Sequence, residues 1–234
     1  FTIEDCLFFF HSIGVFPKSK NGYYYPQSEQ AASVVQAFEQ ELSRLGVTVL
    51  LSVEVTAIAS SAEGVEASTN LGQIFARKLI IATGLLASPK LGSDGSLFDI
   101  IKGLGHRFAP VLPALCGFYC KGLQFKKVSG VRVQGTAAAY IDNKKMAEDS
   151  GELQFTDYGL SGIPVFQISH VLSKGVYEKR NVTIIITLLP EFDRNMLLNE
   201  LNYRKKRFTQ TTVHNLFNGL LPQNLADMIL EKLN

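Results

Sequence analysis

Two continuous apolar runs, separated by short β-type segments, constrain the fold of this chain more than any other feature. The runs lie at residues 47–51 (VTVLL) and 78–82 (KLIIA), and Thr83 and Gly84 follow the second. Such runs are typical of parallel strands that are buried on both faces. Turn residues divide the segment between them, which predicts a β-meander. Its strands are predicted at residues 54–59, 64–69 and 73–76.

Helices and a hairpin are predicted before the first run. Thr2 fits the N-cap of a first helix, because acidic residues follow it directly. A hairpin is expected at residues 15–25, with its turn at residues 20–22. Ser28 fits the N-cap of a longer helix that ends at Gly46. A helix followed by a buried strand favours an α/β layer.

From His106 onward the pattern changes to β-type runs and then to helices. The β runs predict a separate antiparallel sheet or small barrel, with a hairpin turn at residues 142–145. After Pro190 helical spacing returns, and Asp193 fits an N-cap. The β runs lie at residues 116–120, 130–134, 137–141, 151–155 and 182–188, and the helices at residues 193–208, 211–217 and 224–233.

The composition excludes several classes of protein. Hydrophobic residues make up 46% of the chain and charged residues 19%, which is the balance of a folded protein. A formal net charge of +2 gives no general attraction to nucleic acid or to an acidic membrane. The sequence has no apolar run long enough for a membrane helix. Its three cysteines lack zinc-ligand spacing, so we expect no metal site, no disulfide framework and a cytoplasmic location.

Small residues at two places could bring the backbone close to a ligand. Ala82, Thr83 and Gly84 follow the second apolar run, where the alternative is a plain turn after a strand. The segment at residues 92–96 (GSDGS) precedes a helix predicted to end at residue 104, and glycines there would expose backbone N–H groups. On spacing alone, a plain helix N-cap accounts for this segment. The sequence contains no G-x-G-x-x-G fingerprint.

The string at residues 151–164, GELQFTDYGLSGIP, joins a predicted strand to a helix or a second strand. Its residues Tyr158, Gly159, Ser161 and Gly162 could approach a substrate or a flavin, and a corner turn of a barrel without a catalytic role is equally open. The histidines have no acidic or cysteine partner at the spacing of a metal site or a catalytic triad. The basic run at residues 204–207 fits a solvated helix end.

Several strings, taken in order, resemble one family. They are NGYYYPQSEQA at residues 21–31, ATG at 82–84, PKLGSDGS at 89–96, LGH at 104–106, PAL at 113–115, GVRV at 130–133 and the string at 151–164. This order is similar to the HI0933-like, or BaiN-like, flavoproteins, a family of NAD(P)/FAD-dependent oxidoreductases. The resemblance covers essentially the whole chain, and the last string is its most specific part.

The resemblance implies an α/β plus β fold. Residues 1–105 would form the edge of a glutathione-reductase-type FAD domain, residues 106–190 an inserted antiparallel β-barrel-like domain, and residues 191–234 a small helical subdomain. It also implies a Gly-rich dinucleotide motif before Phe1 and a second FAD-contacting segment after Asn234. We therefore expect an internal fragment whose missing segments complete the site. FAD would be the cofactor of the full-length protein and NAD(P)H its co-substrate, while this piece alone would bind FAD weakly and be inactive.

Carried over by position, the resemblance also implies where the cofactor lies. Val55 would contact the adenine, residues 82–84 would pass near the middle of the cofactor, and residues 92–96 would flank the flavin side. Leu85 and Leu97 depart from the family pattern, which commonly has glycine there, and their side chains could obstruct a ligand. The predicted cofactor-binding residues are Val55, Ala82, Thr83, Gly84, Gly92, Ser93, Gly95 and Ser96.

The predicted function is hydride transfer between NAD(P)H and an unknown small organic substrate, with no nucleic-acid or membrane partner. The alternative is a non-catalytic module that binds a ligand or a protein and has lost the flavin site, which the departures at Leu85 and Leu97 favour. The third hypothesis is a purely structural domain fragment with no activity of its own. The sequence identifies no catalytic acid or base.

Overall fold

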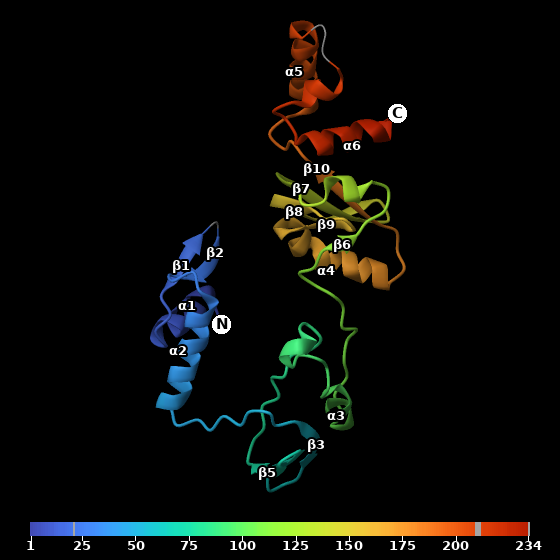
Figure 1. The fold of residues 1–234 in the computed structure, drawn as a ribbon. Coiled ribbons are helices and arrows are strands. Elements are labelled where there is room, and N and C mark those ends of the chain that lie inside the picture. The colour runs from blue at the N-terminus through green and yellow to red at the C-terminus, as the bar shows by residue number, and fades with distance from the viewer. Residues whose placement is uncertain (21, 209–211, 234) are drawn as a thin grey trace. The chain divides into compact units, whose positions relative to one another are not determined.

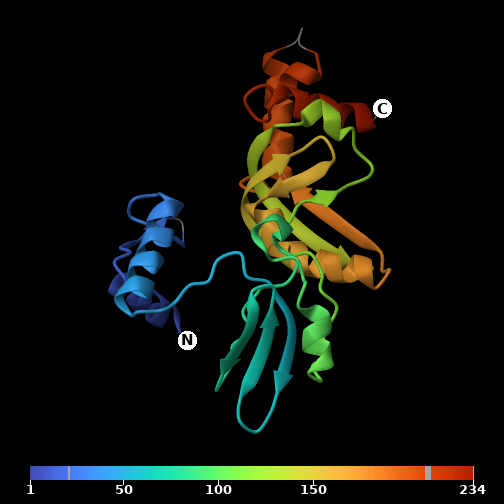
Figure 2. The same ribbon diagram turned by 60° about the horizontal axis from the view of Figure 1, so that its bottom comes forward.

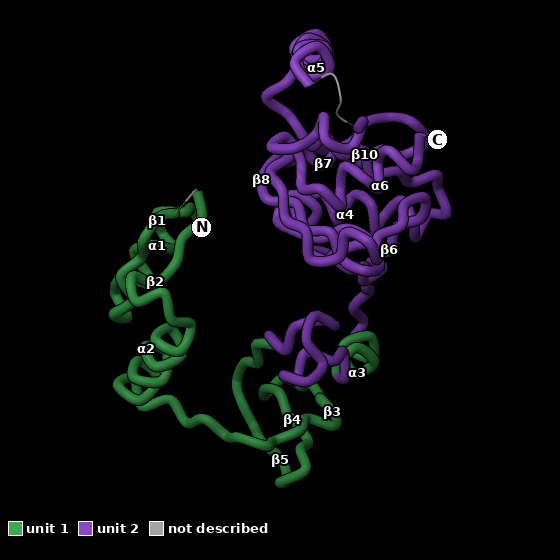
Figure 3. Tube along the Cα trace, turned by 45° about the horizontal axis from the view of Figure 1, so that its top comes forward, with its two compact units in different colours: residues 1–81, 97–104 green, residues 82–96, 105–234 purple. Residues whose placement is uncertain are grey.

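The chain divides into two compact units in the computed structural model, which describes residues 1–20, 22–208 and 212–233. Unit 1 comprises residues 1–81 and 97–104, and unit 2 comprises residues 82–96 and 105–234 (Figure 3). The three-part division at residues 105 and 190 stays a prediction.

Unit 1 begins with α1 (Ile3–Ser12), and its N-cap confirms the prediction at Thr2. The Thr2 hydroxyl accepts a hydrogen bond from the Asp5 backbone N–H at 3.2 Å, and the Asp5 carboxylate accepts one from the Thr2 N–H at 2.8 Å. The hairpin is also confirmed, since β1 (Pro17–Lys20) and β2 (Tyr23–Pro26) pair antiparallel. Its predicted turn includes Asn21, which lies outside the described residues.

The second helix, α2 (Ala31–Arg44), starts later than predicted. Gln30 occupies the N-cap position without a capping side-chain bond, so the prediction of Ser28 was wrong. The Ser28 hydroxyl accepts a hydrogen bond from the Gln30 backbone N–H at 3.3 Å and lies 2.7 Å from the Ser33 hydroxyl. Ser28 therefore stabilises the turn before the helix rather than the helix itself.

The predicted meander is confirmed as a three-stranded antiparallel sheet (Figure 2). Its strands, in spatial order, are β3 (Val55–Ser60), β4 (Val65–Thr69) and β5 (Gly72–Ala76). A Cβ atom at Gly64 would lie 2.6 Å from the Ala76 carbonyl oxygen, so the turn after β3 needs a glycine. The helix predicted at residues 96–104 is present as α3 (Phe98–Gly103).

The two apolar runs do not form the predicted parallel strands. Residues 47–51 and 78–82 have no ladder partner, and every strand pair in the described parts of the chain is antiparallel. Leu51 and Ile80 are 80% and 89% exposed. A strand requires a neighbour for its backbone groups, and an apolar sequence alone does not supply one.

Unit 2 contains a curled five-stranded antiparallel sheet in the order β10-β7-β8-β9-β6 (Figure 1). Asp142 and Asn143 have φ of 48° and 65°, which confirms the predicted hairpin turn between β7 and β8. The two runs predicted at residues 130–134 and 137–141 are one continuous strand. The strands are β6 (Phe118–Tyr119), β7 (Arg132–Ile141), β8 (Lys144–Phe155), β9 (Gly159–Gly162) and β10 (Val182–Thr187).

After the strand in the string at residues 151–164, the sequence left a helix or a second strand open, and the structure has both. The second strand is β9, and the helix α4 (Ile163–Tyr177) covers this sheet and builds the main core. Val165 and Leu172 are fully buried, and they pack with Leu153 and Phe155 of β8. The core therefore lies between β7, β8 and α4, which makes this part of unit 2 a rigid platform.

The C-terminal helices confirm two of three predictions. Asp193 caps α5 (Arg194–Arg207), because its carboxylate accepts a hydrogen bond from the Met196 N–H at 2.8 Å. The last helix is α6 (Gln223–Leu233). Between them the described residues form the short helix η3 (His214–Phe217), and Thr211, where a helix was predicted to begin, lies outside the described part of the chain. No helix in the described ranges is both long and apolar enough to cross a membrane.

Candidate functional site

The predicted cofactor segment at residues 82–84 lies exposed in unit 2 and has no regular secondary structure. Gly84 has a φ of +76°, and a Cβ atom there would lie 2.5 Å from the Ser93 hydroxyl oxygen. Glycine is therefore required for Ser93 to pack against this stretch of backbone. The structure brings these two predicted residues together, while Ala82 and Thr83 stay open to solvent.

A tight turn holds the second predicted segment, residues 92–96. The short helix η1 (Pro89–Leu91) ends at Gly92, which has a φ of +89°. The Asp94 carboxylate accepts a hydrogen bond from the Ser96 backbone N–H at 2.9 Å, and hydrogen bonds from Ser96 lower the pKa of that carboxyl. Gly95 also has a positive φ, of +79°. The polar residues thus organise the loop itself, and the N-cap position of α3 belongs to Leu97.

The structure separates the two leucines that depart from the family pattern. Leu97 is 7% exposed and belongs to the packing of unit 1. Leu85 is 48% exposed and follows Gly84 in unit 2. Val55, the predicted adenine contact, is half-buried at the start of β3 in unit 1. Of the two leucines, only Leu85 remains a candidate obstacle to a ligand at residues 82–84.

The predicted substrate-side residues occupy the turn from β8 into β9 and the start of α4. Gly159 pairs with Tyr119 of β6, and a Cβ atom at Gly159 would collide with the Phe118 carbonyl oxygen. Gly162 is the N-cap of α4, and a Cβ atom there would collide with the Glu152 carbonyl oxygen. Both glycines thus have a packing reason, and Ser161 is 9% exposed in β9.

Tyr158 contacts an aromatic residue that the sequence did not single out. Its ring centroid lies 4.7 Å from that of Tyr119, with an angle of 36° between the ring planes. The two rings are 38% and 86% exposed, for Tyr158 and Tyr119 respectively. Tyr119 lies in the β run predicted at residues 116–120. The residue pattern of that run does not show that the Tyr119 ring is exposed to solvent.

A mostly apolar pocket of about 660 Å³ adjoins these rings, because Tyr119 is one of its lining residues. It lies between the two edge strands of the sheet, β6 and β10, with α6 and the short helix η2 (Phe125–Val128) also contributing. Lys121 is the charged residue among the described lining residues. Cys120 also lines the pocket, and burial raises the pKa of its thiol. The volume lies within the range of small-molecule sites.

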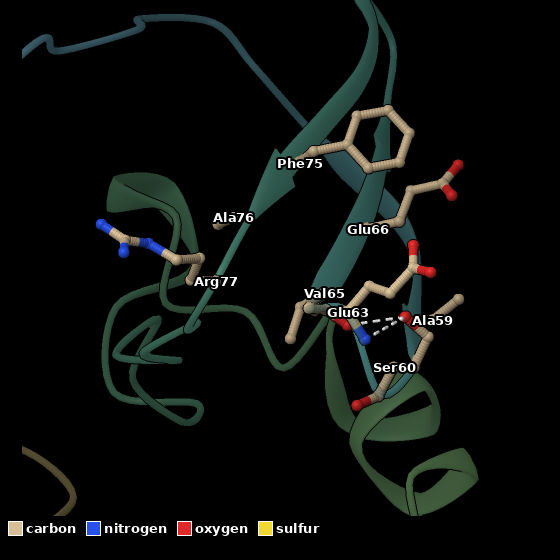
Figure 4. A pocket seen from close by; sticks show the side chains of 10 residues that line it. Ala59, Ser60, Glu63, Val65, Glu66, Phe75, Ala76 and Arg77 are labelled. Carbon is tan, nitrogen blue, oxygen red and sulfur yellow. Dashed lines mark hydrogen bonds between the residues drawn. The ribbon is translucent and has the colours of Figure 1, made fainter.

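A second, smaller pocket of about 490 Å³ lies at one end of the meander in unit 1 (Figure 4). Its charged lining residues are Glu63, Glu66 and Arg77. In Figure 4 the guanidinium of Arg77 points away from the two carboxylates, so the pocket does not gather opposite charges around one centre. None of the predicted site residues lines it.

Two of the described histidines make close polar contacts: His170 Nδ1 lies 3.0 Å from the Gln167 carbonyl oxygen of its own helix, and His214 contacts α6. His214 Nδ1 lies 2.6 Å from the Asp227 carboxylate of α6, and this contact lowers the pKa of Asp227. Both side chains are well exposed, so the pair stabilises the local packing of η3 and α6 rather than a reactive centre. Within the described residues, no group of three or more His, Cys, Asp or Glu side chains could hold a metal ion.

Two family models match this chain, and their matches overlap. A model of the HI0933-like Rossmann domain matches residues 1–172, and a model of the HI0933-like barrel and H2TH domain matches residues 112–234. The chain belongs to the HI0933-like family. This confirms the resemblance found in the sequence, and the curled sheet of unit 2 corresponds to the barrel of the family.

Three curated relatives of this HI0933-like chain are enzymes. The 3-dehydro-bile acid delta(4,6)-reductase of Clostridium scindens is 38% identical over 231 residues, which are 99% of this chain and 56% of the relative. The ribosomal RNA dihydrouridine synthase of Escherichia coli is 28% identical over 204 residues, 86% of this chain and 48% of the relative. The ribosomal RNA dihydrouridine synthase of Haemophilus influenzae is 26% identical over 210 residues, which are 87% of this chain and 49% of the relative. The chain spans about half the length of the curated relatives it matches.

Proposed function

We propose that this chain is part of an FAD-dependent oxidoreductase that reduces a carbon–carbon double bond conjugated to a carbonyl group in a small ring. The proposal rests first on membership of the HI0933-like family. It rests further on the names of the relatives, since a delta(4,6)-reductase and a dihydrouridine synthase both add hydrogen across a double bond of a ring. NAD(P)H supplies the electrons, so the double bond gains a hydride and a proton as NAD(P)H becomes NAD(P)⁺.

One observation on unit 2 supports the cofactor. Residues 82–87 are exposed, and Ala82 and Thr83 present little side chain, so this backbone is open to a ligand except at Gly84, where the Ser93 side chain packs. That is the arrangement a bound dinucleotide needs for close approach. These residues and the loop of residues 92–96 would hold FAD, which supplies the two-electron chemistry when bound. The protein's own contribution is to position the ring and exclude water.

The test uses the full-length protein. Purified protein should carry about one flavin per chain, and anaerobic NADH or NADPH should bleach its visible absorption. Adding a cyclic conjugated ketone should then restore the absorption and yield a product with two more hydrogen atoms, measured by mass spectrometry. A saturated ketone is the control and should restore nothing. Protein without flavin, or flavin that a conjugated ketone never reoxidises, would contradict the proposal.

A pair of variants tests the cofactor segment. Gly84→Ala should lower flavin occupancy, because the new methyl group would displace Ser93 from residues 82–84. Gly105→Ala is the matched control, since Gly105 also has a positive φ, +92°, and nothing lies within 4 Å of the added atom. Equal flavin content in the two variants would remove residues 82–84 from the site.

A further inference from the structure

We propose that Tyr119 and Tyr158 form an aromatic platform on which the planar conjugated ring of the substrate stacks. The proposal rests on the reaction proposed above and adds the place where the ring binds. Packing in the core does not account for the presence of these two aromatic side chains, because Tyr119 is 86% exposed and Tyr158 is 38% exposed. A pair of exposed tyrosine rings in contact, with their planes tilted by 36°, offers an apolar face to a planar ligand.

The backbone beneath the rings is fixed by hydrogen bonds. Within the turn, the Thr156 N–H donates to the Gly159 carbonyl at 2.9 Å, and the Gly159 N–H donates to the Thr156 hydroxyl at 3.1 Å. The Cys120 N–H donates to the Tyr158 carbonyl at 3.0 Å, which ties the turn to the end of β6. A ring held on such a backbone loses little conformational entropy when a ligand binds.

Glycines keep the surroundings of the rings clear. A Cβ atom at Gly117 would lie 2.8 Å from the Leu160 carbonyl oxygen and 3.4 Å from the Tyr158 hydroxyl oxygen. Gly117 therefore lets Tyr158 lie close over the neighbouring strand. Gly159 does the same for the approach of β6 on the other side. Gly117, directly before β6, and Gly159, at the start of β9, thus leave room for Tyr158 and for the pairing of β6 with β9.

The remainder of a substrate has apolar room next to the platform. Tyr119 lines the pocket of about 660 Å³, together with apolar side chains such as Leu123, Ile184 and Ile186. Lys121 at this pocket makes no ion pair among the described residues, so it is free to meet an anionic substituent. A flat conjugated ring with an apolar body is the ligand class that this combination suits.

The first test measures binding to the full-length flavoprotein labelled with 3-fluorotyrosine. Single substitutions of Tyr119 and Tyr158 assign the signals of these two rings. The probes are uridine and a 3-oxo-4-ene steroid carboxylate. Both contain a carbon–carbon double bond conjugated to a carbonyl group, one in a nucleoside and the other in a steroid. Dihydrouridine and the saturated steroid carboxylate are their non-planar controls. Shifts of the Tyr119 and Tyr158 signals with either planar probe, but weaker with its control, are the expected result.

The second test separates stacking from other roles through variants. Tyr119→Leu and Tyr158→Leu should each raise the KM for the planar substrate about 5- to 100-fold, with a smaller change in kcat, as expected from the worth of stacking. Tyr158→Phe keeps the ring and should stay within about twofold of wild type. Tyr177→Leu removes another exposed tyrosine of unit 2, which does not line the pocket, and should change nothing.

The outcomes keep the two proposals distinct. An active flavin reductase whose KM and probe affinities are unchanged in Tyr119→Leu and Tyr158→Leu would overturn the platform and leave the proposed function standing. Equal binding of planar and saturated probes would also overturn it. Tyrosine signals that respond to a planar probe in a protein without flavin would support the platform and contradict the proposed reaction.

Discussion

Residues 47–51 and β10 have nearly the same sequence, VTVLL and VTIIIT, yet only β10 is a strand. In unit 2, β10 pairs with β7 along its whole length, and alternate side chains of β10 are half-buried. In unit 1, residues 47–51 have no partner, and Leu51 is 80% exposed. The difference shows that β-type sequence gives a strand only where another strand satisfies its backbone.

The largest effect expected from this comparison is on stability. Leu153→Ala removes a fully buried side chain from the core of unit 2 and should lower its free energy of unfolding by about 2–5 kcal/mol. Ile80→Ala shortens an apolar side chain at a site that is 89% exposed. It should change the free energy of unfolding by less than about 0.5 kcal/mol. Urea titration of both variants of this chain measures the difference. Similar losses for both would show that residues 78–82 are packed.

A somewhat smaller effect is expected at the corner beneath the two tyrosines. Gly159→Ala should cost about 3 kcal/mol, because its Cβ atom would collide with the Phe118 carbonyl and separate β6 from β9. Gly130→Ala has a similar left-handed constraint, with a φ of +86°, but open space around the new atom. It should cost about 1 kcal/mol by the same titration. Equal costs would mean that the contact between β6 and β9 contributes little to stability.

The smallest effect is a pH dependence at the hairpin of β7 and β8. Asp142 accepts hydrogen bonds from Arg180 Nε at 2.6 Å and from the Asn181 N–H at 3.0 Å, and both lower its pKa. Because the pKa is lower in the folded state, this contribution is full above the unfolded pKa of about 3.9 and is lost as pH falls through the folded value. Carbon NMR titration should show the Asp142 midpoint rising in Arg180→Gln. The titration midpoint of Asp227 serves as the internal reference and should not change. An unchanged Asp142 midpoint would show that Arg180 does not lower the pKa of Asp142.

Local signals in the sequence predicted local structure well. The caps at Thr2 and Asp193 are present because each depends on neighbouring residues only, and the turn at Asp142 and Asn143 is present because both residue types tolerate a positive φ. The helix α4 was left open beside a second strand, although its burial follows the helical period: one face is buried, and Gln167, His170 and Lys174 lie exposed on the other. Ser169 on the buried face accepts a hydrogen bond from the Leu115 N–H at 2.7 Å, a contact between distant segments that the sequence does not show.

The candidate site was predictable only in part. Glycine at position 84 indicated a close approach, but the sequence could not show that Ser93 is the neighbour. The string at residues 151–164 pointed to Tyr158, whereas Tyr119 lies 39 positions earlier and meets it only through the pairing of β6 with β9. Contacts between distant segments depend on sheet register, which composition and spacing do not determine.

Hydrogen exchange in the full-length protein, with and without FAD, tests the central claim that residues 82–96 belong to the cofactor site. Binding of FAD should slow exchange of the amides at residues 82–96 severalfold or more, because their exposed backbone then contacts the ligand. Exchange in β7 and β8 should not change, since their amides are already paired in the sheet. Unchanged exchange at residues 82–96 in a protein that binds FAD stoichiometrically would contradict the account.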